Sequence, residues 1–208
     1  MKKIAFSQLE AARRNPTAFA KALAESGAST ARFSKYMAWQ NSVFHYHKQR
    51  GDLAKAIKYF EATFVKNFAD NSANRAEREN WIKELEGYSI DEVRRRLTYV
   101  EHKKRVTIPI NAELRLGGEL PLIQMNTKGG YSVYFFSRDS SGWDQELKYP
   151  ILQYHVARVL YNVRPDEVEI GVYSVADQRH LQHSFSRRDI RQAIQELDDL
   201  GSEIASAM

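Results

Sequence analysis

Hydrophobic and polar positions along the 208-residue chain follow two different periods. In residues 1–104 the apolar side chains recur every three or four positions, as at Leu53, Ile57, Phe60 and Phe64, which predicts amphipathic helices. In residues 105–185 apolar and polar positions alternate, most clearly from Val106 to Leu116, which predicts strands with one buried face. The pattern therefore indicates a helical region followed by a sheet.

Helix boundaries in the first half are marked by capping residues and proline. Ser7 and Glu10 form a capping box, and Pro16 suits the first position of a second helix. A second capping box, from Ser89 to Glu92, begins the last helix before the strands. The predicted helices cover residues 7–15, 16–27, 31–50, 52–67, 77–85 and 89–104.

The second half predicts strands that a helix interrupts once. The predicted strands cover residues 106–116, 119–125, 131–138 and 168–175, with a strand-like segment at 179–185 and helices at 144–161 and 186–205. We expect turns at Gly117-Gly118 and Gly129-Gly130, and an edge position for the strand that contains Pro109, because proline has no N–H to donate. A helix between two strands implies a crossover and a parallel pair.

These elements predict an α/β (α+β) protein with a mixed sheet of four to five strands. Its core has the order αβββαβ and is flanked by helices, over residues 90–208, which include a C-terminal helix. Residues 1–89 form an N-terminal helical region packed on that core.

Composition narrows the classes of partner. The chain carries 31 basic and 26 acidic residues, a net charge of +5, which is a mild preference for an anionic partner. It contains no cysteine, so disulfides and thiolate metal sites are excluded. The N-terminal residues lack the apolar segment of a secretion signal, and no run approaches the length of a membrane span, so we expect a cytoplasmic protein without a membrane partner.

Four segments carry a family resemblance: FSQLEAARRNPTAF (6–19), LRLGGELPLIQM (114–125), GGYSVYFFSR (129–138) and ELKYPILQYHVARVLY (146–161). In this order they resemble RecB/AddB-like nucleases of the PD-(D/E)XK (restriction-endonuclease-like) superfamily. The resemblance implies a helical segment before an αβββαβ core, with metal-binding acids on the second and third strands.

The acids that this family uses are missing at the matching positions. Pro121 stands where the resemblance places a metal-binding aspartate, while Phe135 and Ser137 stand where it places the second acid and the lysine. Magnesium sites usually include one or two carboxylates, which these side chains cannot supply. The resemblance thus predicts a degenerate nuclease scaffold with no catalytic residue, metal site or cofactor.

An alternative is an active, magnesium-dependent nuclease with migrated acids. Glu146 and Lys148 form an E-x-K sequence, but on the predicted helix their side chains would point apart. The other candidates, which could converge near strand ends, are Glu113, Glu119 and Asp139. The two histidine pairs, at 45/47 and 180/183, lack a third metal ligand at a suitable spacing, and structural or surface roles are favoured.

Basic clusters carry the main functional prediction. The candidates for phosphate contact are Arg94, Arg95, Arg96, Lys103, Lys104 and Arg138, the first five on one helix and its exit. Such cations give salt-dependent, sequence-blind nucleic-acid binding. Interleaved acids such as Glu92 and Glu101 leave a solvated helix face as the alternative.

Together the resemblance and the basic clusters predict a non-catalytic, nucleic-acid-associated protein, in a setting such as a phage-defence, recombination or repair complex. A module that binds a protein partner without nucleic acid is the second reading, and an exposed Trp143 in its polar loop would favour a contact surface. The aromatic residues of 36–46 could stack on bases, but packing of the helices onto the sheet is favoured.

Overall fold

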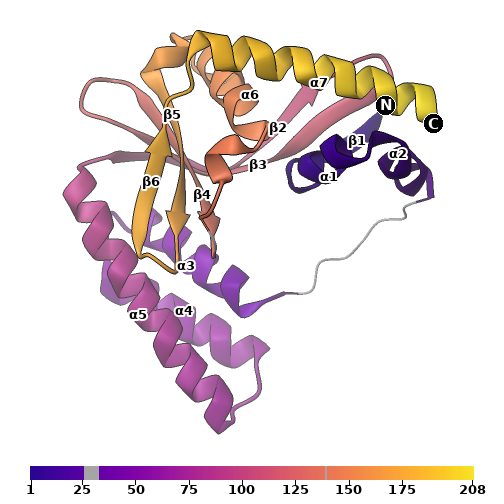
Figure 1. Cartoon of the computed structure of the whole chain (residues 1–208). Coiled ribbons are helices and arrows are strands. Elements are labelled where there is room, and N and C mark those ends of the chain that lie inside the picture. The colour runs from indigo at the N-terminus through magenta and orange to yellow at the C-terminus, as the bar shows by residue number, and fades with distance from the viewer. Residues whose placement is uncertain (26–32, 139) are drawn as a thin grey trace.

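The computed structural model describes residues 1–25, 33–138 and 140–208. Its centre is a six-stranded mixed sheet, and helices cover both faces (Figure 1). The strands are β1 (Lys2–Ala5), β2 (Thr98–Pro109), β3 (Leu114–Met125), β4 (Tyr131–Ser137), β5 (Val168–Ser174) and β6 (Arg179–His183).

Strand β3 organises the sheet. Its whole length pairs antiparallel with β2 on one side. On its other side, residues Leu114–Gly117 pair parallel with β1 and residues Leu122–Met125 pair antiparallel with β4. Strands β4 and β5 are parallel, and β6 is antiparallel to β5.

The helices are α1 (Leu9–Arg14), α2 (Pro16–Glu25), α3 (Lys35–Lys48), α4 (Leu53–Asn67), α5 (Ser72–Arg95), α6 (Lys148–His155) and α7 (Arg187–Ala207). A π-type turn over Val156–Leu160 extends α6, and single 3-10 turns lie at Phe6–Gln8, Trp143–Gln145 and Pro165–Glu167. Within the described ranges, no helix combines the length and apolarity that a bilayer crossing needs.

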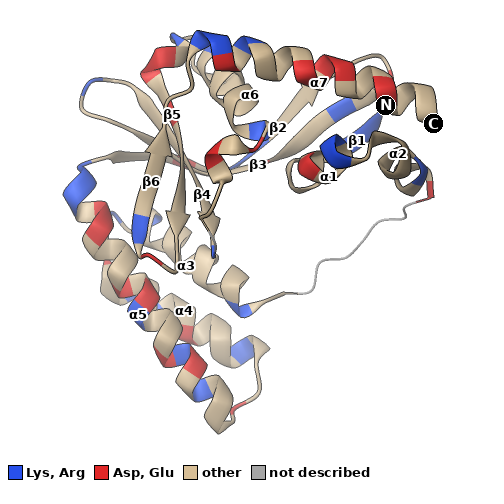
Figure 2. Cartoon of the chain, viewed as in Figure 1, with Lys and Arg blue, Asp and Glu red and all other residues tan. Residues whose placement is uncertain are grey.

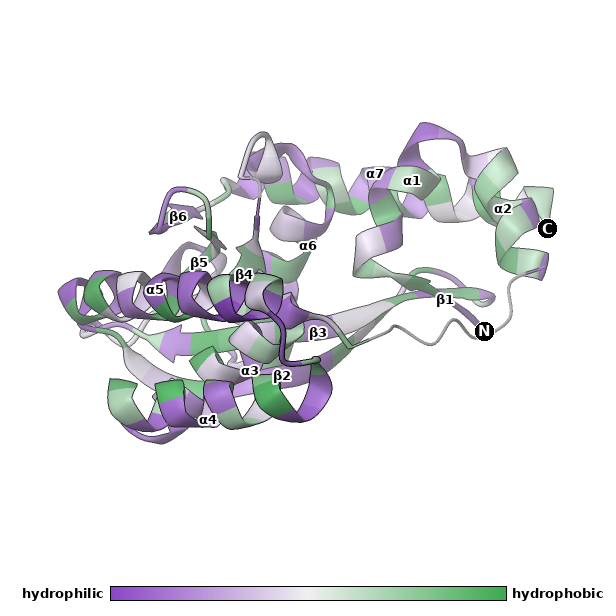
Figure 3. Ribbon diagram, turned by 90° about the horizontal axis from the view of Figure 1, so that it is seen from below, coloured by the Kyte–Doolittle hydropathy of each residue, from purple (hydrophilic) through white to green (hydrophobic). Residues whose placement is uncertain are grey.

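Two cores lie on opposite faces of the sheet, as the view of Figure 3 shows. Helices α1, α2, α6 and α7 bury residues such as Leu9, Leu152 and Ile204 on one face. Helices α3, α4 and α5 pack Trp39 and Tyr88 on the other face. The helical region expected over residues 1–89 is therefore divided: its first 25 residues join the α7 side, and α3–α5 form the opposite layer.

The predicted fold class is confirmed. The order α5-β2-β3-β4-α6-β5 is αβββαβ, and the parallel β4–β5 pair results from the α6 crossover. The sheet has six strands rather than four to five because β1 and β6 both join it. β1 is four residues long, too short for an alternating pattern, and only its pairing with distant β3 makes it a strand.

The helix predicted over residues 89–104 is wrong at both its start and its end. Helix α5 starts at Ser72, runs through Gly87 without a break and ends at Arg95; the next residue, Arg96, has a left-handed φ of 52°. Residues from Thr98 onward form β2, where the consecutive Thr98, Tyr99 and Val100 favour an extended backbone. Lys103 and Lys104 consequently lie on a strand.

The turn predicted at Gly117-Gly118 is also wrong, because both glycines lie inside β3. The chain turns earlier, where the Asn111 Oδ1 accepts the backbone N–H groups of Glu113 and Leu114, each at 2.9 Å. Gly118 is needed for another reason: a Cβ there would overlap the ring of Phe6. The turn at Gly129-Gly130 is confirmed, and Pro109 lies on β2, which pairs only with β3 among the described strands.

Candidate functional site

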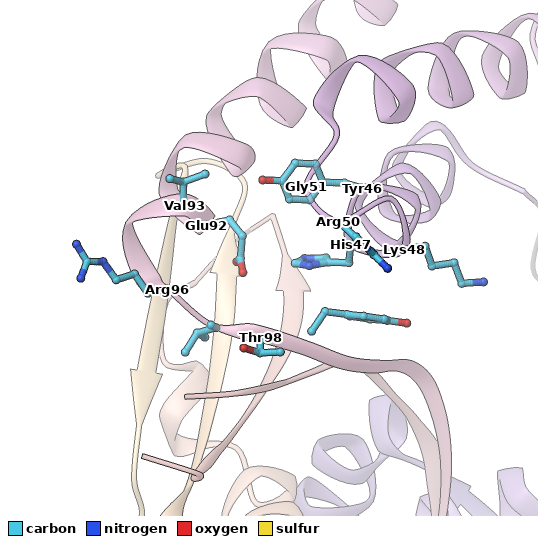
Figure 4. A pocket seen from close by; sticks show the side chains of 11 residues that line it. Tyr46, His47, Lys48, Arg50, Gly51, Glu92, Val93, Arg96 and Thr98 are labelled. Atoms are coloured by element: carbon cyan, nitrogen blue, oxygen red, sulfur yellow. The ribbon is translucent and has the colours of Figure 1, made fainter. Parts of the chain in front are cut away.

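A pocket of about 690 Å³ opens between the C-terminal ends of α3 and α5 and the start of β2 (Figure 4). Its lining residues are Tyr46, His47, Lys48, Arg50, Gly51, Glu92, Val93, Arg96, Leu97, Thr98 and Tyr99. They come from two stretches, 46–51 and 92–99, that are far apart in the sequence.

Left-handed residues at both helix ends shape this pocket. After α3 the backbone reverses through Arg50 (φ 56°) and Gly51 (φ 84°), and after α5 it reverses through Arg96 (φ 52°). Glycine adopts this conformation without strain, whereas an L-residue such as arginine adopts it uncommonly. Both arginines are held there at the mouth of the pocket.

The α3 side of the pocket carries a buried histidine. His47 is 7% exposed, and its Nε2 lies 2.6 Å from the Tyr88 hydroxyl. Its ring stacks on Tyr99 at 5.6 Å between centroids, with 19° between the planes. Burial lowers the pKa of His47 to about 3, so the imidazole is neutral at pH 7.

The α5 side carries a buried carboxylate, Glu92, which points toward His47 in Figure 4. Glu92 is 7% exposed, and burial raises its pKa. Its Oε1 accepts a hydrogen bond from the Gln124 amide, and its Oε2 accepts one from the Tyr88 hydroxyl at 3.4 Å. The Arg95 guanidinium lies 3.8 Å from Oε2. Glu92 thus lines the pocket while its carboxylate is hydrogen-bonded to residues of the interior.

Behind Glu92 lies a second ionisable pair. The Nδ1 of His180 lies 2.5 Å from the Asp91 Oδ2, which also accepts the His180 backbone N–H at 3.0 Å. This hydrogen bonding lowers the pKa of Asp91, whereas burial lowers the pKa of His180 to about 4. The Nε2 of His180 faces the Glu92 Oε2 at 3.7 Å.

Cations surround the mouth of the pocket. We call Lys48, Arg50 and Arg96, which line the pocket, and Lys103, which lies with Lys48 near His102, the cationic rim; all four side chains are exposed. None of them forms an ion pair with a carboxylate among the described residues, although the Lys103 Nζ donates to the Asn41 Oδ1 at 2.7 Å. His102 lies close by: its pKa is lowered by burial and then by the charges of Lys48 and Lys103.

The predicted phosphate-binding residues are not brought together as one surface. Arg96 and Lys103 belong to the rim, and Arg94 is exposed at the end of α5, the blue helix end in Figure 2. Arg95 is turned inward, where it donates to the Tyr134 hydroxyl and its side chain is 13% exposed. Lys104 pairs with Glu101 at 3.2 Å.

Arg138 lies away from the rim. Its guanidinium stacks over the rings of Tyr36 and Trp81, at 5.3 and 5.4 Å from their centroids. It lines a different pocket, together with Glu77 and Glu84. Two acids beside it make this a poor place for a phosphate.

The candidate catalytic residues do not form a cluster. Glu146 precedes α6 in an extended conformation, and its carboxylate lies 2.5 Å from the Lys148 Nζ, so the expectation that these side chains point apart is wrong. Glu113 and Glu119 are exposed at separate places along β3 and its turn, and Asp139 lies outside the described residues. Within the described ranges, no group of three or more histidine, aspartate and glutamate side chains is arranged to hold a metal ion.

Aromatic packing is confirmed for the 36–46 segment. Trp39 is fully buried and its ring stacks on Tyr173 at 5.9 Å. Trp143 is 7% exposed and packs edge-on against Tyr149. The prediction of a contact surface there, which required an exposed Trp143, is therefore wrong. These rings hold the helices on the sheet and are not free to stack on bases.

The sequence interpretation missed Lys48, Arg50 and the role of Glu92, and it gave His47 a structural or surface role without placing it at a site. A signal was present in the run HYHKQRGD at 45–52, where two cations, Lys48 and Arg50, come directly before the glycine that follows α3. The sequence did not indicate that this run lies close to Glu92, which comes more than 40 residues later in the chain.

Comparisons with known proteins add little. No protein-family model matches the chain, and no curated protein matches it. The chain is similar to a solved structure described as "Crystal structure of SSO0001", with 13% identity, a TM-score of 0.33, and coverage of 93% of this chain and 84% of that one. At that TM-score the likeness carries no argument about fold or function.

Proposed function

We propose that this protein is a non-catalytic nucleic-acid-binding protein, built on a degenerate RecB-like nuclease scaffold, that holds a phosphate backbone at the cationic rim. The observation that carries the proposal is the rim itself: four exposed cations without a carboxylate partner, three of which line one pocket. When such unpaired cations neutralise phosphates, the counterions condensed on the nucleic acid are released, and that release drives sequence-independent binding.

The scaffold part of the proposal is supported by the element order and by the sheet. The αβββαβ order is present, and β3 and β4 pair only between Leu122–Met125 and Tyr131–Tyr134, so they do not pair with each other before Leu122 or beyond Tyr134. Directly outside this paired segment stand Pro121 and Phe135, which packs edge-on against Tyr149. Neither side chain can bind a divalent cation, which supports a binding role rather than a nuclease reaction.

The cellular setting is proposed on the family resemblance alone: a cytoplasmic protein within a defence, recombination or repair complex. The binding claim does not depend on that setting.

The test is the salt dependence of binding to a labelled oligonucleotide. In Lys48→Ala/Arg50→Ala/Arg96→Ala, three phosphate contacts are lost, so the slope of log K against log salt should become shallower by about 2 for a single strand. Arg95 stays intact, because Glu92 and Tyr134 would both lose a buried cationic partner without it. Thermal unfolding checks that the variant is folded.

The matched control is the triple Arg187→Ala/Arg188→Ala/Arg191→Ala, three exposed arginines at the start of α7 on the other face of the molecule. It removes the same charge and should leave the slope within about half a unit of wild type. Equal losses in both triples would reduce the effect to net charge and remove the rim as the site.

A protein partner is the second candidate, favoured by one observation. Ile90 and Val93 are 56% and 70% exposed on one face of α5, where apolar side chains gain from being covered. If this protein failed to bind heparin or DNA resin at low salt, we would assign it to this class instead.

A further inference from the structure

We propose that the pocket takes one unpaired nucleotide, with its amino-bearing base directed at Glu92 and its flanking phosphates on the cationic rim. This inference rests on the proposed function and deepens it, because it names the part of a nucleic acid that the site recognises. The volume of the site supports this proposal, because a surface that binds only phosphates does not need a pocket of about 690 Å³. That volume lies in the range of sites that enclose small ligands, about 300–1,000 Å³.

The walls of the pocket suit a flat aromatic ring. Tyr99 lines it and is backed by the stacked ring of neutral His47. On the α5 side, Val93 lines the same space and is 70% exposed, although it is apolar. A base stacked on Tyr99 would cover Val93, and stacking of this kind is sequence-tolerant because every base has a π-face.

Polar recognition inside the pocket is provided by Glu92. An ionised carboxylate only accepts hydrogen bonds, and its two oxygens offer about four acceptor positions. The Gln124 amide and the Tyr88 hydroxyl occupy two of these, and the Arg95 guanidinium and the His180 Nε2 lie 3.8 and 3.7 Å from Oε2. Glu92 also lines the pocket, where an acceptor position that these groups leave open suits an N–H donor. An arriving donor also offsets the burial that raises the pKa of Glu92.

Exocyclic amino groups meet this requirement. Adenine and cytosine present an amino group on the edge used for pairing, whereas thymine presents carbonyl oxygens on both sides of its single ring N–H. A carbonyl directed at a carboxylate is repelled. We therefore expect preference for amino-bearing bases, and only when unpaired, because pairing covers the same edge.

The rim distinguishes a strand from a free nucleotide. In Figure 4, Lys48 and Arg96 extend outward from opposite sides of the mouth. Two cations that diverge in this way fit phosphates on either side of an inserted nucleotide better than they fit one terminal phosphate. The ligand that we favour is therefore an unpaired nucleotide within, or at the end of, a strand.

The experiment is fluorescence anisotropy on the full chain, with oligo-dA, oligo-dC and oligo-dT of equal length, a dA·dT duplex, and free dAMP as competitor. Oligo-dA and oligo-dC should bind at least about tenfold more tightly than oligo-dT, and the duplex should bind less tightly than oligo-dA. An oligonucleotide of unsubstituted purine, which keeps the adenine ring without its amino group, should bind like oligo-dT. Displacement by dAMP at the oligonucleotide's own concentration would identify a free nucleotide as the source and overturn the strand geometry.

Two variants check the assignment of residues. Glu92→Gln should abolish the preference for oligo-dA, while Glu203→Gln, an exposed glutamate on α7, should keep it. The purine oligonucleotide keeps the test decisive even if Glu92→Gln unfolds. Equal affinity for all single strands, with a salt slope that the triple rim variant reduces, overturns this inference and leaves the proposed function standing. Absence of binding to any oligonucleotide overturns both.

Discussion

Acidification should destabilise this protein through two buried histidines. Burial lowers the pKa of His180 from 6.5 to about 4 and that of His47 from 6.5 to about 3. Between these values and 6.5 the unfolded chain binds more protons than the folded one. The free energy of unfolding therefore falls as the pH falls through this window.

The size of the effect follows from linkage. From pH 7 to pH 5, each histidine with such a lowered pKa removes about 2 kcal/mol of stability. Glu92 acts in the opposite direction: because its pKa is raised, its contribution is present below 4.5 and is lost as the pH rises through its folded value. The lowered pKa of Asp91 acts only below about 4, outside the window tested.

The assay is urea unfolding at pH 7 and pH 5, followed by tryptophan fluorescence, since Trp39 and Trp81 lie in the core beside these groups. His180→Asn keeps an amide N–H near the Asp91 carboxylate, and His47→Gln keeps one near the Tyr88 hydroxyl. Each variant should lose about 2 kcal/mol less than wild type between the two pH values.

His45→Gln, on the same helix as His47 and half-buried, is the matched control and should follow wild type. His102 and His155, whose pKa values burial also lowers, remain in all proteins and cancel in the comparison. If both buried-histidine variants lost as much stability as wild type, the two imidazoles would not be held neutral by burial in the folded protein.

Three further outcomes test other parts of the structure. Gly118→Ala should lower the free energy of unfolding by about 1–3 kcal/mol, because the new Cβ overlaps the Phe6 ring; an unchanged urea midpoint would contradict that contact. Trp39→Ala should cost about 3–5 kcal/mol, measured in the same way, because it empties the centre of the α3–α5 core; a cost below about 1 kcal/mol would mean that this core is not packed as described. Supercoiled plasmid should stay intact with magnesium or manganese ions; nicking that disappears in Glu146→Ala would establish the active-nuclease alternative instead.

Local pattern was enough to predict most of the elements and their order. The period-two run from Val106 defined strand structure there, the turn at Gly129-Gly130 was recognised from its glycines, and the helix before β5 implied the parallel β4–β5 pair. These features depend on residues close in sequence, so spacing and turn chemistry reveal them. The packing role of the 36–46 aromatics was predictable for the same reason.

Tertiary contacts decided where the pattern was ambiguous. The segment Thr98–Lys104 has apolar spacing that suits either a helix or a strand, and its pairing with β3 makes it a strand. This pairing changes the site, because it separates Lys103 from the arginines of α5 and places it beside α3, where its Nζ reaches Asn41. On a helix, parts of the two basic clusters could have shared one face.

What the sequence determined by itself was the α/β class and the αβββαβ order. What only the tertiary structure decided was the site: His47 from α3, Glu92 from α5 and His180 from β6 converge across the sheet. The physical reason is range. Periodicity records which face of one element is buried, whereas a site is built where the ends of several elements meet, and no spacing within a single element records that meeting.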